Sequence, residues 1–108
     1  MDREMLNTMV ELLEKGETFV LATVVRTKGS TPREPGSSLI ILPDGRTIGT
    51  IGGGCAEAEV RQRALEVLKS RQPELYCLDL TAEVAEDEGM ICGGIMEVFV
   101  EPLGGCQC

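Results

Sequence analysis

The sequence contains no histidine and no tryptophan, and it has only two phenylalanines and one tyrosine. Without histidine, the chain lacks the commonest general base and the commonest partner of cysteine in zinc sites. Any chemistry must therefore rest on cysteine, carboxylates, lysine, arginine or a bound cofactor. The scarcity of aromatic rings also removes the stacking platforms that bind single-stranded nucleic acids. The core has to be built from aliphatic side chains and methionine.

Basic residues are scarce as well. The chain has 10 Lys and Arg residues against 18 Asp and Glu residues, which gives a formal net charge of −8. Because a protein that binds nucleic acid needs a basic face to neutralise phosphates, we expect no nucleic-acid partner. No apolar run is long enough to span a bilayer, and residues 1–6 lack the pattern of a secretory signal. We therefore expect no membrane partner and a cytoplasmic location.

The chain contains five cysteines, at positions 55, 77, 92, 106 and 108. Their odd number and irregular spacing do not match a disulfide framework, so in a reducing compartment they are metal-binding, reactive or buried. Cys77 lies within a predicted strand, and we expect it to pack in the core. Cys106 and Cys108 form a Cys-x-Cys pair that suits a soft metal, with Cys92 as a third ligand.

The pattern of apolar residues predicts an α+β fold in one domain over residues 1–108, with a flexible tail from about residue 104. We expect a mixed sheet of about five strands packed with two main helices. The run at residues 19–25 is almost continuously apolar, which is typical of a central strand buried on both faces. The predicted helices span residues 2–14 and 56–70, and the other predicted strands span 38–42, 46–51, 74–80 and 95–100, the last ended by Pro102.

Three glycines followed by a cysteine connect a predicted strand to the second helix. Gly52, Gly53 and Gly54 let a ligand approach bare peptide N–H groups, and the helix that follows presents its positive end to the same place. Such a turn suits an anion, and it suits a thiolate at Cys55. Glu57 falls in the first helical turn, where capping of N–H groups is the simpler role, and its charge opposes ionisation of the thiol. The alternative is a tight turn that carries a small buried cysteine.

A second cysteine beside glycines occurs at Cys92, Gly93 and Gly94, directly before the last predicted strand. If the sheet brings the two segments together, they form one pocket lined by peptide N–H groups and two thiols.

The predicted loop at residues 26–36 adds three cations to an otherwise acidic chain, Arg26, Lys28 and Arg33. This local reversal of charge is what capture of a phosphate group requires. The alternative is a solvated loop whose cations pair with the surplus acids.

Taken together, these segments resemble the N-terminal domain of the XdhC/CoxI family, whose members are accessory proteins of molybdenum hydroxylases such as xanthine dehydrogenase and carbon monoxide dehydrogenase. The resemblance covers most of the chain except the first dozen residues and the tail. The matching segments are residues 19–25, Gly-Ser-Thr-Pro-Arg at 29–33, residues 36–39, Asp44-Gly45, Gly-Thr-Ile-Gly-Gly-Gly-Cys at 49–55, Glu57, and residues 92–102.

The resemblance implies a non-catalytic chaperone that binds the molybdenum cofactor, molybdopterin, as cargo, holds it during sulfuration and passes it to an apo-hydroxylase. Cys55 and Cys92 would then be contacts to molybdenum or sulfur, and Arg33 would contact the phosphate. The pterin site would be lined by Gly52, Gly53, Gly54, Cys55, Glu57, Gly93 and Gly94.

Two other functions remain open from the sequence. Cys55 or Cys92 could carry a persulfide in a sulfur-transfer protein, or the chain could be a docking or regulatory subunit that needs no ligand. The partners implied by the resemblance are the apo-hydroxylase and a cysteine desulfurase. Larger members of the family continue into a Rossmann-like domain, so a separate partner with that domain is a further expectation, as is a second copy of this chain.

Overall fold

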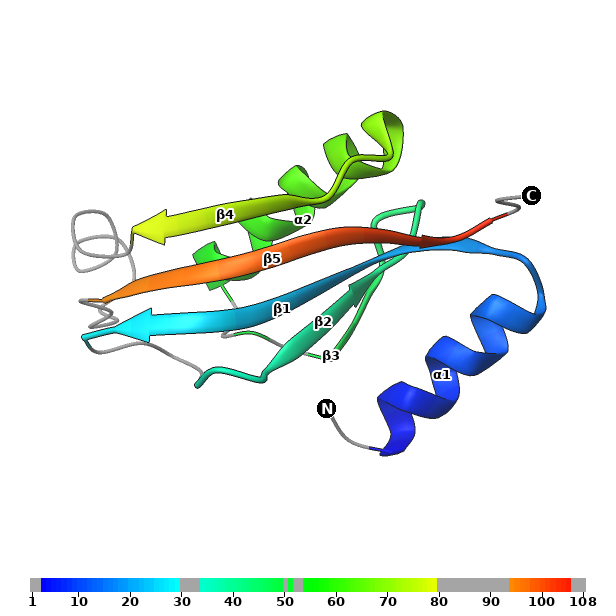
Figure 1. Ribbon diagram of the computed structural model, residues 1–108, viewed down its shortest axis with the longest axis horizontal. Coiled ribbons are helices and arrows are strands. Elements are labelled where there is room, and N and C mark those ends of the chain that lie inside the picture. The colour runs from blue at the N-terminus through cyan, green and yellow to red at the C-terminus, as the bar shows by residue number, and fades with distance from the viewer. Residues whose placement is uncertain (1–2, 30–33, 50, 52–53, 80–93, 106–108) are drawn as a thin grey trace.

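The computed structural model of the protein describes residues 3–29, 34–49, 51, 54–79 and 94–105, and for residues 54 and 55 it describes the backbone only. The described part forms an α+β domain of two helices and five strands (Figure 1). No helix in it has both the length and the apolar character needed to cross a bilayer. In chain order the elements are α1 (Arg3–Glu14), β1 (Thr18–Lys28), β2 (Ser38–Ile41), β3 (Thr47–Gly49), α2 (Gly54–Ser70), β4 (Glu74–Asp79) and β5 (Ile95–Gly104).

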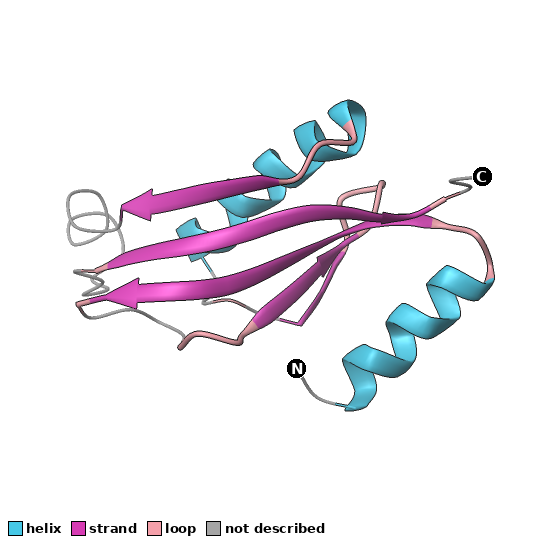
Figure 2. Ribbon diagram, viewed as in Figure 1, coloured by secondary structure: helices cyan, strands magenta, loops and turns pink. Residues whose placement is uncertain are grey.

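The five strands form one sheet in the order β3-β2-β1-β5-β4 (Figure 2). Each of the four pairings is antiparallel, whereas the sequence analysis expected a mixed sheet. The difference arises because α2 connects β3 to β4, which lie at opposite edges of the sheet, so no helical crossover joins neighbouring strands. The expected number of strands and helices is confirmed.

β1 is the central strand, as its apolar sequence predicted. Phe19, Val20, Ala22 and Val24 are fully buried. The strand continues to Lys28, three residues beyond the predicted end, because its polar last residues still pair with β5. A register shift between Val24 and Arg26 marks a β-bulge at this point.

Helix α2 lies against one face of the sheet. Its buried residues Ala56, Val60, Ala64 and Val67 recur at helical spacing and pack into the larger core cluster. The other members of that cluster come from the sheet and from the chain just before α2, and they are Val20, Ala22, Val24, Leu39, Ile41, Ile51, Leu78, Met96, Val98 and Val100.

Helix α1 covers part of the opposite face. Met5 packs with Phe19, Leu21 and Ile40 in a second, smaller cluster. The helix ends where predicted, since Gly16 adopts a positive φ of 71° and its N–H donates to the carbonyl of Leu13 at 3.1 Å. The outer face of α1 also carries large apolar residues, because Leu6, Val10 and Leu13 are each about half exposed.

β5 does not end before Pro102, as the sequence analysis expected, but continues to Gly104. Pro102 pairs with Val20 of β1, while β4 pairs with β5 only as far as Val100. Beyond Val100, β5 therefore has a neighbour on one side only. A proline on such an open side removes no hydrogen bond from the sheet.

Candidate functional site

The ends of three strands lie in a row at one end of the sheet. Lys28 ends β1, Asp79 ends β4 and Ile95 begins β5, and both Lys28 and Asp79 are register partners of Ile95. Gly94, the last residue of the second glycine–cysteine segment, is buried directly before this row. Figure 1 shows the three strand ends together at the left of the molecule. The second segment therefore leads into β5 at this end.

Helix α2 begins at the same end of the sheet. Glu59 contacts Tyr76 and Arg63 contacts Glu74, so α2 and β4 run in opposite directions. From Glu59 back to the start of the helix is roughly 7 Å, at 1.5 Å per residue, and from Tyr76 to the end of β4 is roughly 10 Å, at 3.3 Å per residue. The first turn of α2 thus lies toward the end of the sheet where β4 ends, and Figure 1 shows that α2 begins on this side of the molecule.

The chain is held on both sides of the glycine run. Ile51 is fully buried before it, and Ala56 is 4% exposed after it, and both belong to the core cluster under α2. α2 begins at Gly54, so Cys55 lies in its first turn as predicted, together with the half-buried Glu57. Unpaired N–H groups of a first turn attract anions, while a carboxylate there competes for them.

Two of the three expected cations fall in the described part of the chain. Arg26 forms an ion pair with Glu97 at 3.5 Å, and the Arg26 side chain is 76% exposed. Such an exposed pair contributes little energy and leaves the guanidinium accessible. Lys28 is also exposed, at the end of β1. Since its register partner Ile95 directly follows Gly94, Lys28 places a positive charge at the end of the sheet where the second segment enters β5.

Several predicted site residues lie outside the described residues, namely Arg33, Gly52, Gly53, Cys92 and Gly93. Cys106 and Cys108 lie outside them too. The approach of the Cys55 and Cys92 sulfur atoms therefore stays a prediction. The structure places the backbone of Gly54 and Cys55, in the first turn of α2, at the same end of the sheet as Gly94 before β5.

The expectation that Cys77 packs in the core was wrong. Its side chain is exposed and it forms no disulfide. Cys77 and the neighbouring Leu75 occupy the face of β4 opposite α2, where α1 does not reach, and Leu75 is 56% exposed. The alternation of apolar and polar residues identified the strand, but it did not show that one face of this strand lacks a covering helix.

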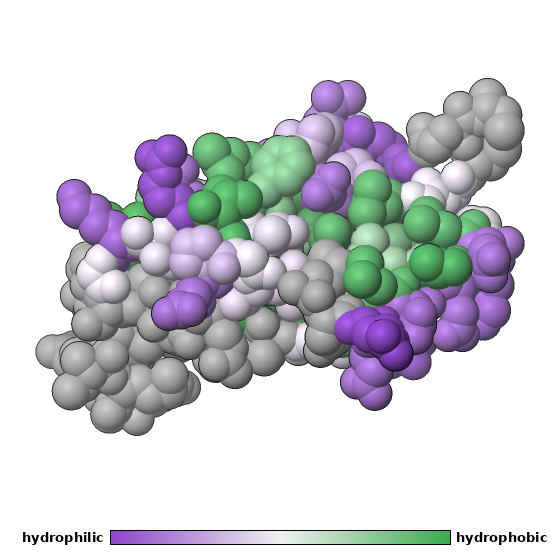
Figure 3. Space-filling model, turned by 60° about the horizontal axis from the view of Figure 1, so that its bottom comes forward, coloured by the Kyte–Doolittle hydropathy of each residue, from purple (hydrophilic) through white to green (hydrophobic). Residues whose placement is uncertain are grey.

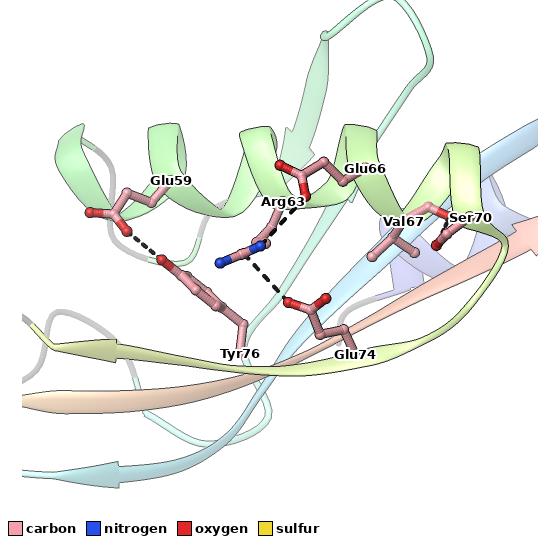
Figure 4. Close-up of polar contacts among 7 residues, drawn as sticks. All are labelled: Glu59, Arg63, Glu66, Val67, Ser70, Glu74 and Tyr76. Atoms are coloured by element: carbon pink, nitrogen blue, oxygen red, sulfur yellow. Dashed lines mark hydrogen bonds and ion pairs between the residues drawn. The ribbon is translucent and has the colours of Figure 1, made fainter.

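A polar cluster between α2 and β4 was not predicted from the sequence (Figure 4). The Tyr76 hydroxyl donates a hydrogen bond of 2.6 Å to Glu59 Oε2, and the Arg63 guanidinium lies 4.7 Å from the centroid of the Tyr76 ring. Arg63 also pairs with Glu66 at 3.5 Å and with Glu74 at 3.4 Å. The only sequence signal was the helical spacing of the three residues contributed by α2.

Four of these side chains, Glu59, Arg63, Glu66 and Tyr76, line a pocket of about 380 Å³ together with Gln62. Because every charged group described above has a partner within the cluster, the arrangement holds α2 at a fixed position along β4. This position determines where the first turn of α2 lies, so the cluster supports the site from one side.

The single tyrosine gives a direct test of this cluster. The hydrogen bond to Glu59 and its negative charge raise the pKa of Tyr76 above the ordinary 10.0. The contribution of this hydrogen bond to stability is therefore complete below pH 10, and it is lost as the pH rises through the pKa of Tyr76 in the folded state. With no tryptophan present, the tyrosinate absorbance reports Tyr76 alone.

We expect this absorbance to appear with a midpoint above pH 10 in the wild type and closer to 10 in Glu59→Gln. The matched control is Glu66→Gln, which removes a nearby charge that does not bond the hydroxyl, and it should leave the midpoint high. A wild-type midpoint at or below 10 would contradict the observed hydrogen bond.

Comparison with known proteins adds an independent observation. The profile of the XdhC and CoxI family matches residues 12–79. The chain is 37% identical over 100 residues to a probable xanthine dehydrogenase subunit of Bacillus subtilis, covering 90% of this chain and 30% of that one. It is 38% identical over 112 residues to the molybdenum cofactor insertion chaperone PaoD of Escherichia coli, covering 97% and 33% respectively.

A solved structure is similar as well. The crystal structure of a xanthine dehydrogenase from Bacillus halodurans superimposes with a TM-score of 0.69 at 29% identity, over 86% of this chain and 30% of that chain. The chain thus spans a third or less of the length of these relatives.

Proposed function

This chain belongs to the XdhC and CoxI family, and from that membership we propose that it is a binding domain for the molybdenum cofactor that serves a molybdenum hydroxylase. The names of two relatives, a molybdenum cofactor insertion chaperone and a probable xanthine dehydrogenase subunit, support this proposal. The structural observation that carries it is the position of the first turn of α2 at the same end of the sheet as Gly94.

The residues at this end of the sheet fit the chemistry of the cofactor. Molybdopterin carries a phosphate, which the N–H groups of a helix N-terminus can bind. The backbone of Gly54 and Cys55 supplies such groups. Molybdenum and its sulfur ligands are soft, and thiolates are soft ligands, so Cys55 and Cys92 are the candidates to contact that part of the cargo.

The remaining glycines would let the pterin lie close to the backbone. We assign this role to Gly52, Gly53 and Gly93 together with Gly94, and we assign binding of the phosphate to Arg33. Glu57 would orient the first turn by accepting backbone hydrogen bonds. This chain supplies binding and orientation, and it excludes water from the cargo. The cargo itself supplies the redox chemistry once it is in the hydroxylase.

A protein in this role has defined partners. We propose that the chain accepts sulfurated cofactor made with a cysteine desulfurase and delivers it to the apo-hydroxylase. We also propose a Rossmann-like domain as a further partner of this domain.

The test measures binding and delivery separately. Purified protein is titrated with molybdopterin under anaerobic conditions, and binding is followed by absorbance. We expect the double variant Cys55→Ser, Cys92→Ser to weaken binding by about tenfold or more, which is about 1.4 kcal/mol per factor of ten. Delivery is then measured as activation of an apo-hydroxylase by the loaded protein.

The matched control is Cys77→Ser, because Cys77 is exposed in the middle of β4 and away from the end of the sheet. It should bind and deliver as the wild type does. No binding by the wild type with its thiols reduced would refute the proposal. Binding that survives in the double variant, with delivery of sulfurated cofactor lost, would instead assign the two cysteines the role of sulfur carriers.

A further inference from the structure

The two edges of the sheet differ in their capacity to pair with another strand. β3 at one edge has three residues and ends at Gly49, whose φ is 95°. β4 at the other edge has six residues, and its register with β5 is unbroken from Glu74 to Asp79. An edge strand carries backbone N–H and C=O groups that can pair with a further strand. β4 offers a longer and more regular row of them.

β4 itself lacks three of the features that prevent edge pairing. It contains no proline, no lysine and no bulge, all of which discourage the addition of a strand. Its outer face carries Leu75, which at 56% is the most exposed of the large apolar residues in the described part of the chain. Leu75 is the register partner of the half-buried Phe99, so two apolar side chains lie together on the face that α1 leaves open.

Figure 3 shows this side of the molecule. Hydrophobic residues gather in two places, one over α1 and one over the middle of the strands. The exposed residues Leu6, Val10 and Leu13 belong to α1, and Leu75 belongs to the strands. The two places are separate surfaces, so substitutions can distinguish between them.

We propose that β4 pairs antiparallel with β4 of a second copy of this chain, so that one sheet continues through both copies. The twofold axis passes beside Tyr76 or Cys77. This inference is independent of the proposed function, because it requires no cofactor.

The positions of the charges argue for a second copy as the partner. The two acids of β4, Glu74 and Asp79, lie on opposite faces of the strand. If the twofold axis passes beside Tyr76, Glu74 lies opposite Leu78 of the second copy and Leu75 lies opposite Cys77. If the axis passes beside Cys77, Leu75 lies opposite Asp79 of the second copy and Tyr76 lies opposite Leu78. Neither arrangement places an acid directly opposite an acid, which would be destabilising.

The same pairing covers the exposed apolar side chain. In both registers Leu75 gains a neighbour from the other copy on its own face, and the two Leu75–Phe99 pairs come to lie near the twofold axis. Such an interface is isologous, since the same surface of each copy contacts the other. The assembly is therefore complete with two copies.

Sedimentation equilibrium of the whole chain at physiological ionic strength tests the proposal. Since one chain has a mass of 11.6 kDa, we expect 2 × 11.6 = 23.2 kDa for the wild type and 11.6 kDa for Leu75→Lys. The matched control is Leu6→Lys, which adds the same charge at a residue of similar exposure, 49%, on α1, and it should remain dimeric. Circular dichroism verifies that both variants are folded.

Three outcomes would overturn the proposal. They are a monomeric wild type, a dimer that Leu75→Lys leaves intact, and a dimer that Leu6→Lys dissociates, which would place the contact on α1.

Disulfide trapping then identifies the register. In a variant whose other four cysteines are serine, oxidation should join two copies through Cys77 if the axis lies there, because opposed Cα atoms are then about 5 Å apart. If the axis lies at Tyr76, the diagonal distance between the two Cys77 residues is about 7–8 Å, and joining requires the additional substitution Leu75→Cys. No covalent dimer in either variant would exclude β4 pairing.

Discussion

Replacing Gly104 with alanine is expected to destabilise the protein by about 3 kcal/mol or more. Gly104 has a φ of 78°, and a Cβ built there would collide with the backbone carbonyl oxygen of Glu17. That oxygen cannot move away freely, because it accepts a hydrogen bond from the N–H of Gly105 at 3.2 Å. The substitution must therefore separate the paired ends of β1 and β5. For a domain stable by about 5–15 kcal/mol, this is a large fraction of the total.

The matched control is Gly16→Ala. Gly16 also has a positive φ, of 71°, but no atom lies within 4 Å of the position that a Cβ would take. The free energy of unfolding of this variant should fall only by the cost of the left-handed conformation, about 1–2 kcal/mol. Urea unfolding of both variants gives the comparison. Equal losses of stability in the two variants would show that the ends of β1 and β5 can separate at little energetic cost and that the collision has no energetic consequence.

Replacing Val60 with aspartate is expected to remove a large part of the stability of the protein. Val60 is fully buried between α2 and the sheet, in the core cluster with Ala56 and Ala64. The change removes apolar contacts and places a carboxylate where the cluster offers only hydrocarbon, which costs more than about 4 kcal/mol. Far-ultraviolet circular dichroism and thermal unfolding would show the loss, and cofactor binding should weaken with it because α2 carries the candidate site.

The matched control for that experiment is Gln62→Asp. Gln62 lies on the same helix and is exposed, and its substitution adds the same single negative charge. We expect a change within about 0.5 kcal/mol. Cooperative unfolding of Val60→Asp close to the wild-type temperature would mean that α2 is not held by this cluster, and the position of its first turn would then need another explanation.

The elements with strong periodicity were predictable from the sequence. The helices begin within two residues of their predicted starts, and the apolar run in β1 correctly indicated a central strand. The ends of β1 and β5 were not predictable in the same way. Arg26 to Lys28 have the composition of a loop, and Pro102 has that of a strand end, yet both continue a strand because a neighbouring strand is present to pair with them. Pairing of this kind depends on tertiary structure.

The candidate site was predictable in its chemistry and less so in its geometry. The glycines and Cys55 indicated a strand-to-helix turn, and α2 does begin at Gly54. That Gly94 would lie at the same end depended on the strand order and on the direction of α2 relative to β4, neither of which has a local signal. The bond between Tyr76 and Glu59 was missed for the same reason, since its partners are separated by 17 residues.

The register shift in β1 has a consequence for the charges at the end of that strand. Val24 pairs with Val98 and Arg26 with Glu97, so one extra residue, Val25, reverses the alternation of the strand. Without this insertion, Arg26 and Lys28 would point toward the hydrocarbon beneath α2. With it, both project from the opposite face into water. One extra residue thus allows the same strand to be apolar and buried for most of its length and to carry exposed charges at its end.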